Sequence, residues 1–200
     1  MYCTLAVVFL AILAPVGIAT AKAPSGRTCT PPEKGFHYKV PCPKAAGKAK
    51  IQVTKITATQ GSPPVSVDSA GGLDLTKPLV LAFNMTYNGK PIKSHRLDQK
   101  LWKYAADEHG RCQWQELDTG GITDDLDACP TYKNVDCSYK QPLPRIVNST
   151  IDWAAMYGEA ISALETGSYY AFDVLERDGS EFLNCFWIQA KVIKNIPPID

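Results

Sequence analysis

Asp118, Thr119 and Gly120, in the stretch "ELDTGG", come closest of all residues in this chain to a catalytic motif. Asp-Thr-Gly carries the catalytic carboxylate of aspartic proteases, which need two carboxylates that share one proton. The chain holds a single Asp-Thr-Gly, so a protease would require a second copy. The polar residues Gln115 and Glu116 precede the tripeptide, where a protease has a buried apolar strand. We therefore interpret Asp118 as part of a polar turn.

The other titratable groups form no catalytic or metal-binding pattern. His37, His95 and His109 are scattered, and the adjacent Asp107–His109 cluster is typical of a solvated surface. The sequence lacks the G-x-S-x-G elbow of serine hydrolases and the H-E-x-x-H zinc motif. We expect no catalytic residue, no metal and no cofactor, and hence no enzyme. A hydrolase that uses Asp118 or the Asp107–His109 cluster is the alternative.

Residues 1–21 have the layout of a secretory signal peptide. An apolar run at 5–13 is followed by Pro15, Gly17 and small residues that fit a cleavage site near Ala21, although a basic stretch before the run is missing. The apolar run is too short to span a bilayer. We expect an exported, soluble mature protein.

Cysteines and glycosylation sequons agree with export. Cys3 leaves with the signal peptide, and an even number of cysteines in an exported chain predicts disulfides. The disulfide candidates are Cys29, Cys42, Cys112, Cys129, Cys137 and Cys185. Their spacings do not match a zinc site. Asn84 and Asn148 begin N-x-Thr sequons and are the predicted glycosylation sites.

Charge limits the partners. The formal net charge is +1, which argues against a nucleic-acid partner. The charged residues at 22–55 are mainly basic, and those at 107–127 are mainly acidic. We interpret both as solvated faces; the alternative is that the basic face meets an anionic lipid surface.

The mature chain divides into an irregular arm at 22–41, one domain at 42–194 and a tail at 195–200. Alternating or β-branched segments predict strands at 51–57, 65–67, 77–87, 95–104, 145–151, 168–176 and 182–193. Short strands joined by turns predict an all-β, immunoglobulin-like two-sheet sandwich. Residues 107–145 are predicted to form disulfide-tied loops. Residues 152–165 are predicted to form one short amphipathic helix.

The segment 161–192 resembles the ganglioside-activator branch of the ML (MD-2-related lipid-recognition) domain family. The residues that carry the resemblance, in order, are Leu164, Thr166, Gly167, Tyr169, Val174, Leu175, Gly179, Leu183 and Cys185. It continues upstream in "CPKAAGKAKIQVTKITAT", "LTKPLVLAFNMTYNG" and "CSYKQ". It covers residues 42–193 and is weakest at 92–136.

The resemblance implies a cup-shaped sandwich around a lipid cavity, with Cys42 paired to Cys185. Two arrangements of the other cysteines stay open. In one, Cys112 pairs with Cys137 and Cys29 with Cys129; in the other, Cys129 pairs with Cys137 and Cys29 with Cys112.

Apolar side chains on the alternating strands and the helical segment are the candidate lipid-binding residues, although ordinary core packing explains the same pattern. They are Leu79, Leu81, Phe83, Met85, Trp153, Tyr157, Ile161, Phe172, Val174, Phe186 and Ile188. Trp153, Met156, Tyr157 and Ile161 either form a membrane-touching rim or pack inward.

The resemblance further implies a secreted or lysosomal protein that binds a glycosphingolipid, phospholipid or sterol. Such a protein touches membranes transiently and presents its lipid to a lysosomal glycosidase. A secreted module that binds protein or glycan without a cavity is the alternative.

Overall fold

The computed structural model describes residues 29–39, 49–87, 92–127, 145–153, 155 and 158–195 of the chain. The predicted signal peptide and parts of the predicted arm and tail lie outside these segments. So do Cys42, Cys129, Cys137, Met156 and Tyr157. Within the described segments, no helix is both long and apolar enough to cross a membrane.

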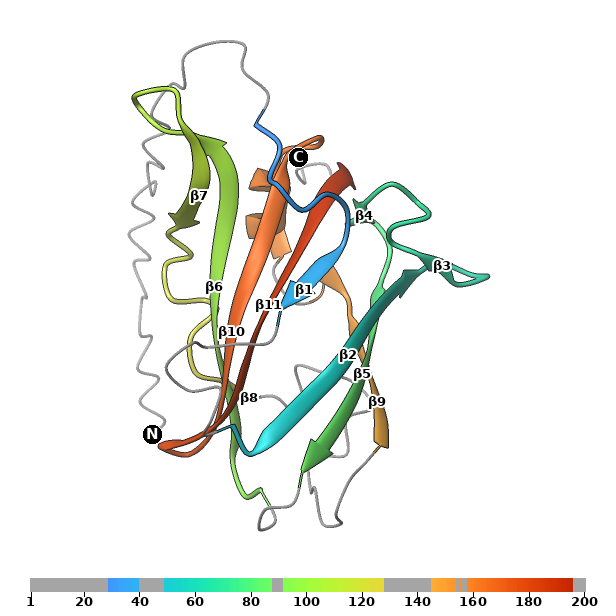
Figure 1. The fold of residues 1–200 in the computed structure, drawn as a ribbon, viewed down its shortest axis with the longest axis vertical. Helices are drawn as coiled ribbons and strands as arrows, with labels where there is room; N and C mark the ends of the chain where they lie inside the picture. The colour runs from blue at the N-terminus through green and yellow to red at the C-terminus, as the bar shows by residue number, and fades with distance from the viewer. Residues whose placement is uncertain are drawn as a thin grey trace, which may run out of the picture.

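Two β-sheets packed face to face make up the fold, which confirms the predicted all-β sandwich (Figure 1). The strands of the larger sheet are β1 (His37–Lys39), β4 (Leu73–Asp74), β6 (His95–Ala106), β7 (Cys112–Leu117), β8 (Leu126–Asp127), β10 (Tyr169–Asp178) and β11 (Glu181–Lys194). Those of the smaller sheet are β2 (Ile51–Gln60), β3 (Val65–Ser66), β5 (Leu79–Tyr87) and β9 (Arg145–Ile151).

The larger sheet has the order β1-β11-β10-β6-β7, with β4 paired to β11 and β8 paired to β6. The smaller sheet has the order β3-β2-β5-β9. Neighbouring strands are antiparallel except β4, which runs parallel to β11. Because β1 and β11 are neighbours, the two ends of the described chain lie in one sheet.

Strand β5 shows why the alternating segments of the sequence form this sandwich. Its odd-numbered side chains, from Leu79 to Tyr87, are buried, whereas Asn84 is exposed on the opposite face. Each fully buried large apolar side chain contributes about 1.5–3 kcal/mol. A shift of the strand by one residue would turn this whole row to water, so the register is well determined.

The two inner faces meet through aromatic contacts. Phe83 of β5 and Phe186 of β11 have ring centroids 5.5 Å apart, and both are buried. Trp153, just after β9, stacks on Phe172 of β10 at 6.0 Å. Offset or tilted aromatic pairs of this kind contribute about 0.5–1.5 kcal/mol beyond their burial. Both contacts join one sheet to the other.

Strand β11 is tied to the other half of the sandwich at both of its ends. Near its start, the backbone N–H of Lys50 donates to the carbonyl of Leu183 at 2.8 Å. Near its end, β11 pairs with β4, and the side chain of Gln60 in β2 bonds the backbone N–H and carbonyl of Asp74 in β4 at 2.9 and 2.8 Å. The two sheets are thus joined by hydrogen bonds near both ends of β11.

The sequence predicted only disulfide-tied loops for residues 107–145, but this stretch also contains the strands β7 and β8. Strand β7 pairs with β6 from Ala106↔Cys112 to Leu101↔Leu117, and β8 also pairs with β6. Most side chains of β7 are half-buried or exposed, so its sequence "CQWQEL" carries no alternation of apolar and polar residues. The residues of this stretch from 128 to 144 lie outside the described part of the chain.

The predicted amphipathic helix at 152–165 is helical in part, and residues 154, 156 and 157 lie outside the described part of the chain. Trp153 and Ala155 are helical, and a 3-10 helix, η1, spans Gly158–Ala163. A glycine in the middle of a helix costs about 1 kcal/mol relative to alanine, which disfavours one continuous helix through Gly158. The periodic apolar residues nevertheless pack inward, because Trp153, Ile161 and Leu164 are all buried.

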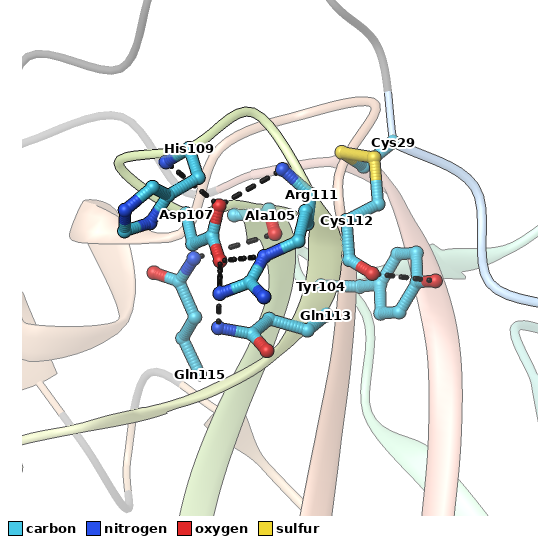
Figure 2. Close-up of a disulfide and its surroundings, with 9 residues drawn as sticks. All are labelled: Cys29, Tyr104, Ala105, Asp107, His109, Arg111, Cys112, Gln113 and Gln115. Carbon is cyan, nitrogen blue, oxygen red and sulfur yellow. Dashed lines mark hydrogen bonds and ion pairs between the residues drawn. A yellow bond between two sulfur atoms is a disulfide. The ribbon is translucent and has the colours of Figure 1, made fainter.

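The segment 29–39, called the strap below, crosses the outer face of the larger sheet. A disulfide joins Cys29 to Cys112 on the edge strand β7 (Figure 2), and β1 lies at the opposite edge of the sheet. Between these ends, the side-chain amide of Gln189 donates to the carbonyl of Glu33 at 2.7 Å. Pro31 is fully buried. The predicted irregular arm is therefore in part a structural element of the sheet.

The disulfide Cys29–Cys112 decides between the two arrangements left open by the sequence. The pairing of Cys112 with Cys137 and of Cys29 with Cys129 is wrong. Cys185 is also disulfide-bonded. The predicted pairings of Cys42 with Cys185 and of Cys129 with Cys137 involve cysteines outside the described residues.

We predict that Gly72→Ala destabilises the fold by about 3 kcal/mol, whereas Gly71→Ala costs about 1 kcal/mol. Both glycines have positive φ, 151° at Gly72 and 77° at Gly71. A Cβ at Gly72 would lie 2.4 Å from the carbonyl oxygen of Lys191, while one at Gly71 would meet nothing within 4 Å. Denaturant unfolding measures both variants. Equal losses would show that β11 gives way to the added methyl group.

Candidate functional site

An apolar cavity of about 30 Å³ lies at one end of the sandwich, between the sheets. The smaller-sheet side contributes Leu79 and Trp153, and the larger sheet contributes Phe172, Ile188 and Val192. The other lining residues are Phe36, Leu73, Leu75, Leu164, Tyr170, Gln189 and Ala190. Such a lining offers van der Waals contact but few hydrogen bonds, so it suits an alkyl group rather than a polar ligand.

A second cavity, of about 20 Å³, adjoins the first deeper in the sandwich. Trp153, Phe172 and Ile188 line both cavities. The other lining residues of the second cavity are Leu81, Gln99, Ile151, Val174 and Phe186. The two cavities are separate and small, and they lie one after the other along β10 and β11, from Val192 towards Val174.

Seven of the eleven predicted lipid-binding residues line these two cavities. They are Leu79, Leu81, Trp153, Phe172, Val174, Phe186 and Ile188. Phe83, Met85 and Ile161 are buried and line neither cavity, and Tyr157 lies outside the described residues. Trp153 and Ile161 are only 2% and 4% exposed, so of the two alternatives for these residues, inward packing holds and a membrane-touching rim does not.

The main residues that sequence reasoning missed are Phe36 of the strap and Leu73 and Leu75 around β4. These residues lie in short segments without regular alternation, so no periodic signal marks them as buried. Ala190 and Val192 carried such a signal, because they share one face of β11 with Phe186 and Ile188. The cavity thus combines one regular face with irregular segments that close its end.

The hydroxyl of Tyr170 supplies a polar atom at the first cavity. It accepts a hydrogen bond from the backbone N–H of Glu165 at 2.7 Å. Burial raises the pKa of Tyr170 from 10.0 to about 12, so the phenol stays neutral at physiological pH. The bond holds the end of the helical segment 153–165 against β10.

Asp118 lies in an exposed polar turn, as predicted. Its Oδ1 accepts the backbone N–H of Gly120 at 2.8 Å, and the two glycines after Thr119 both have positive φ. The hydroxyl of Thr123 donates to the carbonyl of Gln99 at 2.7 Å, which anchors the turn to β6. The carboxylate of Asp118 therefore has a local structural role in shaping the turn.

Asp107 likewise stabilises a turn, between β6 and β7 (Figure 2). Its carboxylate accepts the backbone N–H groups of Arg111 at 2.8 Å and His109 at 2.9 Å, and it pairs with the Arg111 guanidinium at 2.8 Å. The backbone bond from Arg111, together with that guanidinium, lowers the pKa of Asp107. A carboxylate held in this way is a poor general base.

A buried polar cluster lies on the inner face of the larger sheet, outside both cavities. His95 Nε2 is 3.7 Å from Glu176 Oε1, and Asn184 lies directly opposite Glu176 in the β10–β11 ladder. All three are less than 9% exposed. Asn184 interrupts the apolar face of β11 in the sequence, and its buried side-chain amide forms no hydrogen bond with the residues that the structure describes. No group of three potential metal ligands occurs among the residues the structure describes.

Comparison with known proteins identifies no relative: neither a family model nor a curated protein matches this sequence.

We predict that Tyr170→Phe costs about 1 kcal/mol of stability at pH 8 through the lost hydrogen bond. The folded protein keeps the phenol proton up to about pH 12, whereas the unfolded chain releases it near 10.0. The stability linked to this hydroxyl is therefore present below pH 10 and is lost as the pH rises towards 12. Denaturant unfolding between pH 8 and 12 should show a shallower alkaline decline for Tyr170→Phe than for the wild type.

Tyr104→Phe is the control, because the Tyr104 hydroxyl bonds the carbonyl of Cys112 outside the cavity. An unchanged alkaline decline in Tyr170→Phe would contradict the assignment of this phenol.

Proposed function

We propose that this protein binds the alkyl chain of a lipid between its two sheets. The observation that carries the proposal is the pair of adjoining apolar cavities, which share Trp153, Phe172 and Ile188. Their elongated arrangement along β10 and β11 suits one extended chain better than a broad ring system. The resemblance to lipid-recognition domains supports the same ligand class.

The energetics favour a carrier of this kind. Exposing an alkyl chain to water costs about 0.8 kcal/mol per methylene, and a bilayer already avoids that cost. A protein that takes lipid from a membrane must therefore offer an equally apolar site, so that the exchange is nearly neutral. The aromatic and aliphatic lining around Phe172 meets this requirement.

The cavities must expand to admit a chain. Their volumes, about 30 and 20 Å³, fall far below the roughly 300–1,000 Å³ of typical ligand pockets. We expect the helical segment 153–165 to move, because the polar contacts that hold its end break more easily than the two sheets separate. Asn195 Nδ2 donates to the carbonyls of Ser162 and Leu164, and Lys103 pairs with Glu165 at 2.7 Å. Breaking such surface contacts costs little compared with separating two sheets.

The wider role follows from the same proposal. We propose that the protein is exported, takes its lipid from a membrane during a transient contact and carries it through the extracellular space or the lysosomal lumen. Presentation of a glycosphingolipid to a lysosomal glycosidase is the most specific form of this role. It rests on the resemblance rather than on the cavities.

We predict that the protein secreted from eukaryotic cells carries lipid in native mass spectrometry and binds a fluorescent fatty acid at a one-to-one ratio. Ile188→Trp should weaken this binding at least tenfold, because the larger ring fills the point where both cavities meet. Val65→Trp is the matched control, since Val65 is 44% exposed on β3. Circular dichroism checks that each variant is folded.

A second measurement covers the case in which Ile188→Trp does not fold. A brominated fatty acid should quench the fluorescence of buried Trp153 in the wild type, and Trp153→Phe should lose that component. A folded wild type without bound lipid, probe uptake or quenching would overturn the proposal. That result would favour an interaction module for protein or glycan.

A further inference from the structure

Strand β9 is an edge of the smaller sheet. Its seven residues, Arg145–Ile151, pair with β5 from Met85↔Arg145 to Leu79↔Ile151. No other strand among the described residues pairs with β9 on its second side. Among the described residues, the backbone groups on that side pair with no strand, and an unpaired edge of this kind is the usual route to edge-to-edge association.

The sequence of β9 lacks most of the features that protect edge strands. Natural edges are commonly short, or carry lysines, prolines or a bulge. The sequence "RIVNSTI" has a single charged residue, Arg145 at its start, and no proline. The register between β5 and β9 is also continuous, without a bulge. The sequence of β9 itself therefore offers little protection against pairing.

The row of residues through the middle of β9 on the outer face of the smaller sheet is uncharged, and exposed Lys55 lies farther away on β2. Asn148 is exposed and lies opposite Ala82 of β5, which in turn lies opposite Thr57 of β2. Asn84 is exposed on the same face, two positions along β5 from Ala82. Both asparagines begin N-x-Thr sequons, so both predicted glycosylation sites are on this face.

Asn148 is the middle residue of β9. If β9 paired antiparallel along its full length with β9 of a second copy, Asn148 would lie directly opposite Asn148 of that copy. The two Cα atoms would then be about 4.5–5.5 Å apart, with both side chains on the same face. Two N-linked glycans cannot occupy adjacent positions this close, because each is bulky and needs water.

We propose that a glycan on Asn148 protects the edge of the smaller sheet and prevents this chain from pairing with a second copy through β9. Asn84 has a different position, because β5 is an interior strand with β2 on one side and β9 on the other. A glycan on Asn84 covers the face but does not guard the edge. The proposal is independent of lipid binding, since Asn148 lines neither cavity.

The experiment compares single variants secreted from eukaryotic cells, by intact mass for glycan occupancy and by light scattering after gel filtration for oligomeric state. The wild type should be glycosylated at Asn148 and monomeric. Asn148→Gln and Thr150→Ala both remove this sequon and should form dimers, with association at least tenfold tighter than in the wild type. Asn84→Gln should stay monomeric. Thr150→Ser keeps the sequon and should also stay monomeric, so it controls for the change at residue 150.

Asn148→Lys distinguishes pairing through β9 after loss of the glycan from a failure to fold. Two lysines directly opposite each other repel, so this variant should be monomeric without a glycan. If the unglycosylated Asn148→Gln is poorly secreted because it pairs through β9, Asn148→Lys should restore secretion. An unglycosylated Asn148 in the secreted wild type would overturn the proposal. A monomeric Asn148→Gln would also overturn it. So would poor secretion of both Asn148→Gln and Asn148→Lys.

Discussion

The attachment of β11 to the opposite half of the sandwich at both of its ends determines the shape of this protein. Lys50 bonds Leu183 near the start of the strand, and near its end the strand pairs with β4, which Gln60 of β2 bonds at Asp74. The chain around β4 is held so closely there that only a glycine fits at position 72. Between these two points, the contacts that the structure describes between the sheets are made by apolar side chains such as Phe83 and Phe186. The second cavity lies along this middle stretch, and the first extends from Ile188 to the β4 end, where Leu73 and Leu75 line it.

The same residues therefore serve both stability and the proposed binding. Phe83 and Phe186 fill the interior by contacting each other across the sheets. Trp153 and Phe172 also stack, but they border open volume as well. These two side chains gain packing energy when they contact other residues of the protein. They lose little when a ligand chain replaces those contacts, because the old and the new contacts are both apolar. A core and a lipid site built from the same alternating strands thus differ in local spacing rather than in residue type.

This difference explains what could be predicted from the sequence. The alternation in β5, β10 and β11 gave their inner faces, and seven candidate residues lie at the cavities. Strand β7 could not be recognised, because it is half-exposed on both faces and its pairing with β6 is made by the backbone. The strap was equally hidden, since a disulfide, hydrogen bonds with the side chains of Gln189 and Asp68, and backbone pairing of β1 with β11 hold it in place. Neither leaves a periodic pattern, and the cysteine pairing was open until the fold brought Cys29 to Cys112.

The two outer faces differ in a way that limits where a ligand can reach the interior. The strap and a cluster of Trp102, Trp114 and Trp187 lie on the outer face of the larger sheet, with Lys39 Nζ 4.9 Å from the Trp187 ring centroid. A ligand cannot cross a hydrogen-bonded sheet, so the proposed alkyl chain must enter between the sheets, and the two ends of the sandwich differ in how well they suit it. One end contains the buried His95–Glu176 pair and the Lys50–Leu183 bond, which disfavour an alkyl chain. At the other end, the helical segment that ends at Glu165 lies over an apolar cavity and is held by the Lys103–Glu165 ion pair and by part-buried hydrogen bonds from Asn195. For the proposed lipid binding, that end is the one where admitting an alkyl chain costs least.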